Sequence, residues 1–520
     1  MGLLKRLLGS KTPDRLASTF EIRQVRGVPV PFQAGAVYPT FEAARPRLYL
    51  LDNWFARRVE RPVVSGPLPR TEAVRRDLAA EAGGATWPPA SYVPCQAPQG
   101  EAGVVWYARR FDAPLGYRGT TTRLVFFAAN HLSDVFLNGE YLGWHEGGYT
   151  PFSFLVPGER LADRDNDLRV RVERPEEASD LPAGILGPVY FEALPAARIE
   201  RLDAIPDGDG FSCTVVAAGA IPRGSLIRLG LHTAEASDDL SAEAIRGPEV
   251  ATRDTGLTVM DGVGVATDRV APPDAAYWSP ARPTLYVVRA DLLCDGRLLD
   301  TVSVQAGLRT VGLKDGRLML TGQPSLLCGL VRSRQLGVDL REVLAQGADL
   351  LLGPALDLAM PLMADRLGLA LALPVGTLQG AETMLQPLRE MVFLHRNRPS
   401  VLSLVVSEGE AAGAATGRML EELNALGSGW TLIARQCHGL TSGEAAKGNV
   451  ILWTSAMDAL TASGSVQLLL TLTAEGLPDL EAYLRKGKAL CGVVADGGVG
   501  PEVFEGVRAA FRQGLWSGSV

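Results

Sequence analysis

Residues 134–154 read DVFLNGEYLGWHEGGYTPFSF, and this stretch contains the clearest local fold signal in the chain. Two runs rich in apolar and aromatic residues, 134–137 and 140–144, flank the dipeptide Asn138-Gly139. Both residues tolerate the positive φ of a type I′ turn, and Asn-Gly between two such runs is the strongest short-range hairpin signal. The stretch therefore predicts an antiparallel β-hairpin.

Similar β-type runs surround this hairpin on both sides. They read VVWYARRF at 104–111, TRLVFFAA at 122–129 and DLRVRVE at 167–173, and Gly, Pro and Asn turns separate them. Short, regularly spaced strands are typical of a sandwich or jelly roll. We therefore predict a jelly-roll β-sandwich over residues 101–196. Residues 1–100 are rich in Pro and Arg and weakly periodic, which predicts an N-terminal extension that packs on this first domain.

A second β zone covers residues 197–311. Its runs include FSCTVVAAG (211–219), LIRLGLHTA (226–234), TLYVVRADLL (284–293) and LLDTVSVQAG (298–307). A length near one hundred residues is typical of a single immunoglobulin-like β-sandwich.

After Arg309, apolar runs alternate with helical stretches, which indicates βα units and a parallel sheet. Eight strand–helix units predict a compact (β/α)8 TIM barrel over residues 312–520. The fold class is thus multidomain β plus α/β. The eight runs are SLLCGLV (325–331), ADLLLGP (348–354), LALALPV (369–375), VLSLVVS (401–407), TLIARQC (431–437), VILWTS (450–455), VQLLLTLT (466–473) and ALCGVVAD (489–496).

Composition excludes several classes of function. The chain has 520 residues, a net charge of −7 and 47% apolar residues. Nucleic-acid binding needs a basic face, so an acidic balance argues against it. No run approaches the roughly 18 apolar residues of a transmembrane helix. Six scattered cysteines without a CxxC pair suggest neither a disulfide framework nor a metal site, and they favour a reducing cytoplasm. No cofactor is predicted.

Several motifs together resemble glycoside hydrolase family 2, the β-galactosidase and β-glucuronidase family, over roughly residues 100–500. The stretch 103–111 resembles its G-x-x-W-Y-x-R-x-F, and 134–154 its V-x-x-N-G-x-x-V-G-x-H-x-G-G-Y-x-P-F. Further matches are Trp278 to Tyr286 (W-x-P-x-x-P-x-L-Y), Gly307 to Arg309 (G-x-R), Asp365 to Leu369 (D-x-L-G-L) and Arg396 to Val401 (R-N-H-P-S-V). The family order of jelly roll, immunoglobulin-like sandwich and TIM barrel agrees with the three zones.

The resemblance implies two catalytic Glu residues, about 5–5.5 Å apart in a retaining glycosidase. The acid/base ends the fourth strand of the family barrel, and its register places it at position 409, which is Gly409 here. Glu408 and Glu410 flank that position, and Glu410 is the preferred candidate. Both also precede a predicted helix, where acids favourably meet the helix dipole.

The implied nucleophile ends the seventh strand. Glu475 follows the seventh run and is the candidate that strand counting favours. Asp496, the last residue of the eighth run, competes because its sequence distance from Glu410 is more usual for the family. An Asp there holds its oxygens short of a Glu's reach, and catalysis rarely tolerates such a displacement.

Other groups that the family uses are replaced. Its strand-two R-x-x-H aligns with Leu352 and Ala355, and its R-G-x-N strand aligns near Cys328 and Val331. We therefore expect an eroded active site. Four side chains remain as candidates for sugar binding, namely Trp453 in the barrel and Trp144, His145 and Tyr149 in the first domain.

Two functions follow from these observations. The first is a non-hydrolytic carbohydrate-binding or scaffolding protein, that is, a pseudo-glycosidase. The alternative is a divergent retaining β-glycosidase of the β-galactosidase or β-glucuronidase type, using Glu410 and Glu475. The expected partners are a carbohydrate and, by resemblance, further copies of the chain or a scaffold partner.

Overall fold

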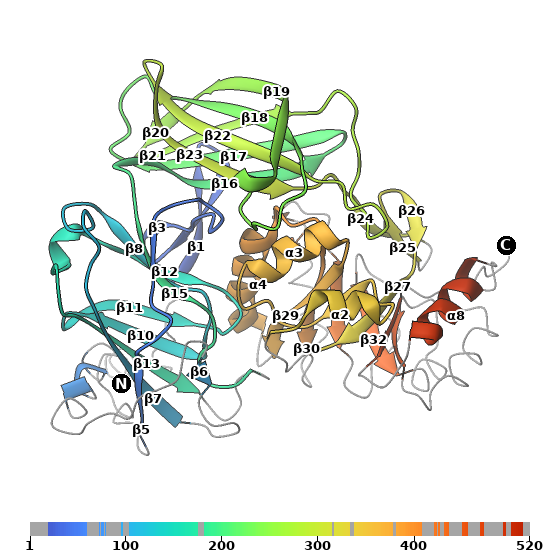
Figure 1. Ribbon diagram of the computed structural model, residues 1–520, viewed down its shortest axis with the longest axis horizontal. Helices are drawn as coiled ribbons and strands as arrows, with labels where there is room; N and C mark the ends of the chain where they lie inside the picture. Colours follow the sequence, from blue (N-terminus) through green and yellow to red (C-terminus); the bar gives the residue numbers. More distant parts are fainter. Residues whose placement is uncertain are drawn as a thin grey trace, which may run out of the picture.

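The computed structural model combines two β-rich regions with a barrel of parallel strands (Figure 1). None of the helices among the described residues is both long and apolar enough to cross a membrane. The structure describes residues 19–59, 72, 74–76, 78–79, 95–96, 103–174, 181–314, 317–332, 337–377, 381–407, 421–423, 425–426, 431–435, 450–455, 468–472, 492–495 and 501–512.

Two antiparallel sheets form the first region. A five-stranded sheet contains, in spatial order, β11 (Glu140–Glu146), β10 (Leu132–Leu137), β13 (Asn166–Arg174), β7 (Gly103–Phe111) and β5 (Phe55–Val59). A four-stranded sheet contains β12 (Phe152–Val156), β8 (Thr122–Phe126), β15 (Val189–Ala193) and β4 (Arg47–Tyr49). A small third sheet contains β6 (Cys95–Gln96), β14 (Gly184–Ile185) and β9 (Ala129–Asn130).

The hairpin predicted from Asn138-Gly139 is confirmed. Leu137 pairs with Glu140, so the loop has two residues. Asn138 has φ 50° and Gly139 φ 81°, and both belong to the region that a type I′ turn requires. The Asn138 side chain also donates to the carbonyl of Arg160 at 2.9 Å, which fixes the turn to the neighbouring loop.

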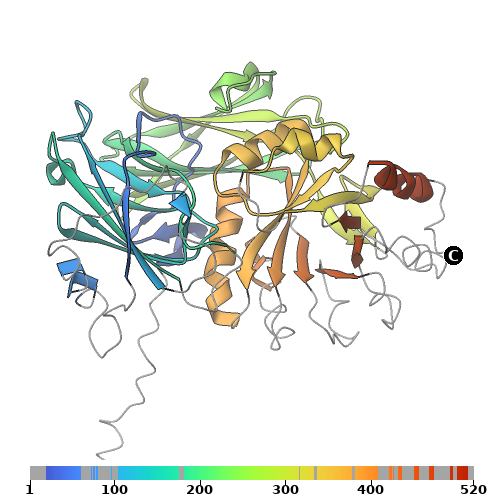
Figure 2. The ribbon, with the colours of Figure 1, turned by 60° about the horizontal axis from the view of Figure 1, so that its bottom comes forward.

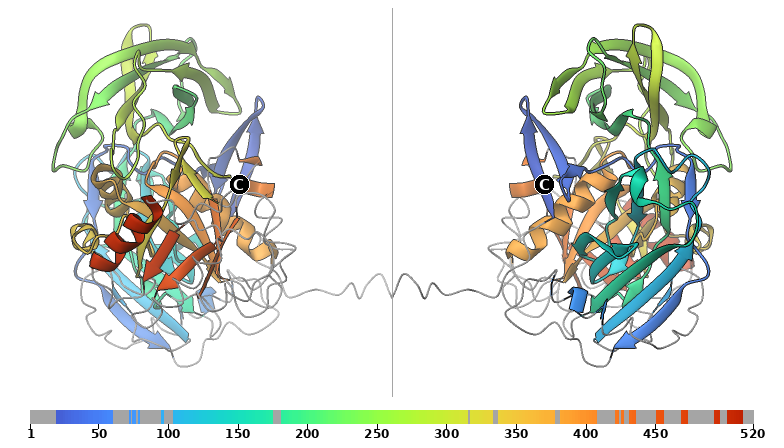
Figure 3. Two further views of the ribbon diagram at one scale, coloured as in Figure 1. Left: turned by 90° about the vertical axis from the view of Figure 1, so that its right-hand side faces the viewer. Right: turned by 90° about the vertical axis from the view of Figure 1, so that its left-hand side faces the viewer.

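The segment before residue 60 does more than pack on the first region. It supplies β4 and β5, which are edge strands of the two sheets. It also forms a separate sheet of β1 (Phe20–Val25), β2 (Val28–Gln33) and β3 (Ala36–Val37). This sheet packs on the second region through Val216 and Val265, while β1 lies beside the barrel helix α4 (Ala381–His395) (Figure 3). Strands this short leave little periodicity in the sequence.

The second region is a pair of four-stranded antiparallel sheets around one apolar core. One sheet contains β16 (Ala197–Asp207), β17 (Gly210–Gly219), β21 (Val263–Val270) and β20 (Thr258–Met260). The other contains β19 (Arg246–Gly256), β18 (Leu226–Ala234), β22 (Tyr286–Cys294) and β23 (Arg297–Ala306).

A closed barrel of eight parallel strands follows a small hairpin sheet of β24 (Val311–Lys314), β25 (Arg317–Leu320) and β26 (Gln323–Ser325). Each of the eight predicted runs contains one barrel strand. The strands are β27 (Leu327–Val331), β28 (Leu350–Leu352), β29 (Ala370–Thr377), β30 (Val401–Ser407), β31 (Thr431–Arg435), β32 (Val450–Ser455), β33 (Leu468–Leu472) and β34 (Gly492–Ala495).

The described helices that accompany the barrel are α2 (Leu340–Ala345), α3 (Ala359–Leu367), α4 and α8 (Pro501–Arg512). Helix α4 lies between the barrel strands and the first region (Figure 2). Alternate strand residues point to different cores: Val331, Leu352 and Val405 join an inner cluster, while Leu330 and Leu351 pack with the helices. Alternation of this kind is what a barrel with a filled interior requires.

The motif Arg396 to Val401 fastens the barrel to the rest of the chain. Arg396 pairs with Asp203 at 3.0 Å, and the Asn397 side chain accepts from the amide of Ala204 at 2.8 Å. Arg398 pairs with Asp365 of α3 and with Glu42 of the N-terminal segment, each at 2.8 Å. These ion pairs and hydrogen bonds join the second region, the N-terminal segment and the barrel at one place.

His395 ends α4 beside this junction and is fully buried. Within the described part of the chain, neither of its ring nitrogens has a hydrogen-bond partner. Burial, helped by the nearby Arg398 guanidinium, lowers the pKa of His395 from 6.5 to about 3. The folded protein therefore holds this imidazole neutral, whereas the unfolded chain protonates it below about pH 6.5.

We expect the fold to lose stability as the pH falls below about 6.5, by about 1.4 kcal/mol per pH unit from His395 alone. The sign follows because the unfolded state binds the extra proton. His395→Leu should remove this slope, as judged by denaturation midpoints at about pH 7.5 and about pH 5. His131→Leu, at a half-buried histidine that pairs with Glu146, is the control. An unchanged slope in His395→Leu would contradict the prediction.

Candidate functional site at the barrel mouth

The carboxyl ends of the barrel strands meet at one end of the barrel, where the active residues of such barrels lie. In the barrel order, β30 is the fourth strand and β33 the seventh. Glu408 and Glu410 follow the end of β30 at Ser407, and Glu475 follows the end of β33 at Leu472. Asp496 follows directly after β34.

These four carboxylates lie outside the described residues, so their separations stay a prediction. Trp453 lies on β32, where its backbone pairs with Arg435 on one side and Leu469 on the other. Trp453 is therefore a barrel-strand residue, and its side chain lies outside the described part of the structure.

The described positions of the mouth that align with polar groups of the family are apolar. Leu352, which aligns with the family's strand-two Arg, is buried at the end of β28 and belongs to the inner cluster with Val331. Ala355, which aligns with the strand-two His, is buried in the loop that follows. These positions offer no proton donor, no charge and no hydrogen-bonding side chain to a sugar.

Cys328 on β27 is also buried. Burial, followed by the effect of the Asp349 carboxylate, raises the pKa of Cys328 from 9.0 to about 12. A thiol with such a pKa stays protonated near neutral pH, and the thiolate is the nucleophilic form of cysteine. Cys328 therefore packs as a small apolar side chain.

His145 and Tyr149 lie at the interface between the first region and the barrel. His145 is buried, its ring stacks on Phe152 with centroids 4.5 Å apart, and its Nε2 lies 3.2 Å from Oε2 of Glu390 on α4. Tyr149 is buried in the same apolar cluster as the outer face of the barrel strands. Trp144 is half-buried on β11, opposite Asp134 of β10.

Glu390 is the residue that sequence reasoning missed. It is buried and accepts a second hydrogen bond from the Thr150 hydroxyl and a third from the Gln386 amide at 3.1 Å. The available signal was an acid one helical turn after Gln386 on the core-facing side of α4. Its partners His145 and Thr150 lie about 240 residues earlier in the chain, so no local pattern pointed to them.

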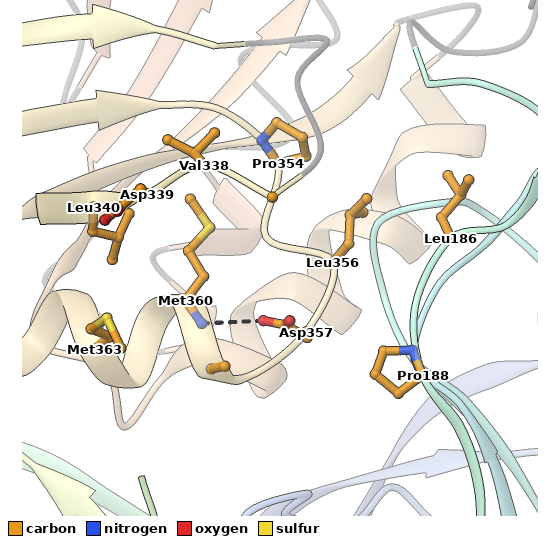
Figure 4. A pocket seen from close by; sticks show the side chains of 12 residues that line it. Leu186, Pro188, Val338, Asp339, Leu340, Pro354, Leu356, Asp357, Met360 and Met363 are labelled. Carbon is orange, nitrogen blue, oxygen red and sulfur yellow. Dashed lines mark hydrogen bonds between the residues drawn. The ribbon is translucent and has the colours of Figure 1, made fainter. Parts of the chain in front are cut away.

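A cavity of about 350 Å³ opens at the barrel rim, between the first region and the loops that follow β27 and β28 (Figure 4). Asp339 accepts from the amide of Arg341 at 2.9 Å, and Asp357 accepts from the amide of Met360 at 3.1 Å. Both carboxylates thus cap helices. Apolar side chains form most of the lining, among them Leu186, Pro188, Val338, Leu340, Leu356, Met360 and Met363.

Among the described residues, no group of three or more His, Cys, Asp and Glu side chains is arranged to hold a metal ion. The described positions of the mouth that align with the family's polar groups are apolar, whereas Arg332, directly after β27, and Asp339 and Asp357 at the rim cavity are charged. In the family register, the carboxylates for acid–base chemistry would be those after β30, β33 and β34.

Comparisons with known proteins find no matching family model. The chain is 25% identical over 242 residues to the β-galactosidase of Thermoanaerobacter pseudethanolicus, covering 44% of this chain and 31% of that protein. It is 29% identical over 236 residues to the β-galactosidase of Lactobacillus delbrueckii subsp. bulgaricus (44% and 22%). It is 23% identical over 236 residues to the β-glucuronidase of Streptococcus agalactiae (43% and 38%). The aligned part therefore spans well under half the length of these relatives.

Solved structures resemble the fold over most of the chain. The β-glucuronidase of Bifidobacterium dentium complexed with coumarin-3-O-glucuronide superposes with a TM-score of 0.67 at 18% identity, covering 88% of this chain and 92% of that one. The β-glucuronidase of Bacteroides uniformis superposes with a TM-score of 0.68 at 17% identity (87% and 64%). At these identities the likeness concerns the fold.

Proposed function

We propose that this chain, which resembles the β-galactosidases and β-glucuronidases of glycoside hydrolase family 2 in sequence and in fold, is a non-hydrolytic carbohydrate-binding protein. In this interpretation, residues 101–196 form the jelly roll, residues 197–311 the immunoglobulin-like sandwich and residues 312–520 the TIM barrel. The N-terminal segment completes the jelly roll by supplying β4 and β5.

The observation that carries the proposal is the set of apolar side chains at the mouth positions that align with the family's polar groups. Catalysis of glycoside hydrolysis needs groups that position the sugar and tune the pKa values of two carboxylates. At the aligned positions the chain has Leu352, Ala355 and Val331, all buried among other apolar side chains. A site that has lost several such groups together keeps shape complementarity for a ligand and loses the means to stabilise a transition state.

The alternative is a divergent retaining β-glycosidase with Glu410 as acid/base and Glu475 as nucleophile. The positions of these residues favour it, since they follow the fourth and the seventh barrel strand. Glu408 would replace Glu410 as the acid/base if the register of the fourth strand differs. Asp496 would replace Glu475 as the nucleophile if the nucleophile follows the eighth strand. Trp453 on β32 would then line a sugar subsite.

Hydrolysis and binding of 4-nitrophenyl β-galactoside, β-glucuronide, β-mannoside and β-glucoside separate the two functions. We expect at least one glycoside to bind, as measured by calorimetry, and none to be hydrolysed faster than in buffer. Turnover that falls about 100-fold or more in both Glu410→Gln and Glu475→Gln would overturn the proposal and establish the enzyme. Asp496→Asn tests the substitute nucleophile: if it abolishes turnover and Glu475→Gln does not, the nucleophile is Asp496. A folded protein that neither binds nor turns over any of the four would contradict carbohydrate binding and favour a scaffolding role.

A further inference from the structure

A second cavity, of about 530 Å³, lies where the first region, the second region and the barrel meet. Five segments far apart in the sequence line it, one of which contributes Phe127 after β8. The other four are the N-terminal segment 41–49, the first-region strand end and loop around Pro188 and Tyr190, the loop 240–242 of the second region, and the start of α3 at 357–362. The cavity therefore exists only when all these parts are docked together.

One wall of this junction cavity is aromatic. Tyr49 is 47% exposed, and its ring centroid lies 5.3 Å from that of Tyr190. Phe41 and Phe127 also line the cavity, with their ring centroids 5.8 Å apart. Aromatic rings offer large apolar faces, and a Tyr adds a polar tip. An exposed Tyr at the edge of a cavity is a platform on which a ring-shaped ligand can stack.

The polar side of the same wall is Arg47, whose guanidinium carbon lies 4.5 Å above the centre of the Tyr190 ring. Four of its five N–H groups donate, two of them to the carbonyls of Phe41 and Ala43, one to Glu192 and one to the Tyr49 hydroxyl. Among the described residues, one N–H remains for a ligand. Burial raises the pKa of Tyr190, so the Tyr190 hydroxyl stays protonated beside Arg47.

Arg47 is also the accessible end of a charge network with excess positive charge. Arg47 and Arg123 share Glu192, and Arg123 and Arg198 share Glu200, so three arginines face two glutamates. Both glutamates are buried, as are the other two arginines, while Arg47 keeps 20% of its side chain exposed. Arg47 is the arginine of this network that lines the cavity.

The loop before α3 contributes Asp357 to the lining. Its Oδ1 accepts from the Met360 amide, which fixes the carboxylate in place. Asp357 lines both cavities, so this carboxylate stands where the junction cavity adjoins the rim cavity. Pro188, Asp357 and Ala359 line both cavities. A ligand in the junction cavity thus meets an aromatic platform, a cationic donor and an anionic acceptor, which is the mixture that sugar hydroxyls and an apolar sugar face match.

We propose that the junction cavity is a carbohydrate-binding site separate from the barrel mouth, which takes a pyranose ring stacked on Tyr49 with its polar groups at Arg47 and Asp357. A neutral sugar and a sugar acid share this chemistry; a direct contact with Arg47 favours the acid, although Glu42 and Asp357 also line the cavity. The site goes beyond the proposed function, because it is built outside the barrel mouth and stands whether or not the barrel hydrolyses glycosides.

Calorimetric titration of the full chain with methyl β-D-glucopyranoside and with methyl β-D-glucuronide tests the site. Both should bind, and the glucuronide more tightly, with an advantage that shrinks as salt screens Arg47. Tyr49→Ala should weaken both affinities about tenfold, which is the loss of one good ring contact. Tyr49→Phe, which keeps the ring, should bind nearly as the parent protein does.

Phe55→Ala is the matched control, because Phe55 is an aromatic residue of the same region, 43% exposed, on the other sheet. It should bind both sugars with unchanged affinity. Binding that is equal in the parent chain and in Tyr49→Ala would overturn the junction site and assign the sugar to the barrel, leaving the proposed function intact. No binding of either sugar by the folded parent chain would also overturn it.

Discussion

Replacing Arg398 with Ala is expected to lower the free energy of unfolding by about 3–5 kcal/mol. Arg398 is buried, pairs with Asp365 and Glu42 and donates to the carbonyl of Gln305. Its removal leaves two buried carboxylates without their counter-ion. Burial raises the pKa of both carboxyls, and the Arg398 guanidinium is the main opposing influence. Loss of one partner of a buried pair is costly for this reason.

The sign of the pH dependence in Arg398→Ala follows from the same carboxyls. Without the guanidinium, their folded-state pKa values rise further above the unfolded values, so the folded variant holds extra protons at mildly acidic pH. Its stability should therefore fall as the pH rises, and the gap to the parent chain should be wider at about pH 7.5 than at about pH 5.

Urea denaturation followed by intrinsic fluorescence measures this change. Arg389→Ala is the control: Arg389 pairs with Glu422 at 2.6 Å but keeps 32% of its side chain exposed. Removing a partly exposed pair costs at most about 1 kcal/mol. Equal losses in the two variants would show that the junction around Arg398 contributes no more than a surface pair.

The second large effect is expected at Glu390. Glu390→Ala removes the acceptor of His145, Thr150 and Gln386 from a buried interface. Hydrogen bonds to a charged group are worth about 1.5–3 kcal/mol each, so we expect a loss of about 3 kcal/mol or more. Because the contacts with His145 and Thr150 join α4 to the first region, the first melting transition of the chain should move to lower temperature.

Two further variants separate the hydrogen bonds from general packing. Glu390→Gln keeps one acceptor oxygen at the same place and should lose clearly less stability than Glu390→Ala. Glu422→Ala removes a partly exposed acid of the same region and should cost no more than about 1 kcal/mol. A Glu390→Ala protein that melts like Glu422→Ala would contradict the role assigned to this contact.

The burial of His145, whose sugar contact stays a prediction, shows what local patterns leave open. Nothing in the run LGWHEGGYTPF predicts that His145 is buried. It lies on β11, an edge strand in which the residues before His145 are half-buried. In the structure, α4 covers His145, and the Glu390 carboxylate is the hydrogen-bond partner of its Nε2. Whether a helix covers a strand residue depends on how the barrel docks, which periodicity within the strand does not encode.

The sequence by itself determined those features whose cause lies within a few residues. The Asn138-Gly139 turn, the eight apolar barrel runs and the order of their strands all follow from local backbone preference and side-chain alternation. For the same reason, Glu410 and Glu475 could be assigned to the ends of two particular strands, although their separation stays a prediction. Residues that follow a strand by a fixed count need no knowledge of the rest of the chain.

Only the tertiary structure decided which distant residues meet. It pairs Arg398 with Glu42 across 356 positions, places Glu390 against His145, and brings Tyr49, Tyr190 and Asp357 around one cavity. It also assigns β4 and β5 to sheets whose other strands lie after residue 100. The physical reason is that such contacts depend on the docking of whole regions, which is driven by the burial of many side chains together. No single stretch of sequence contains that information.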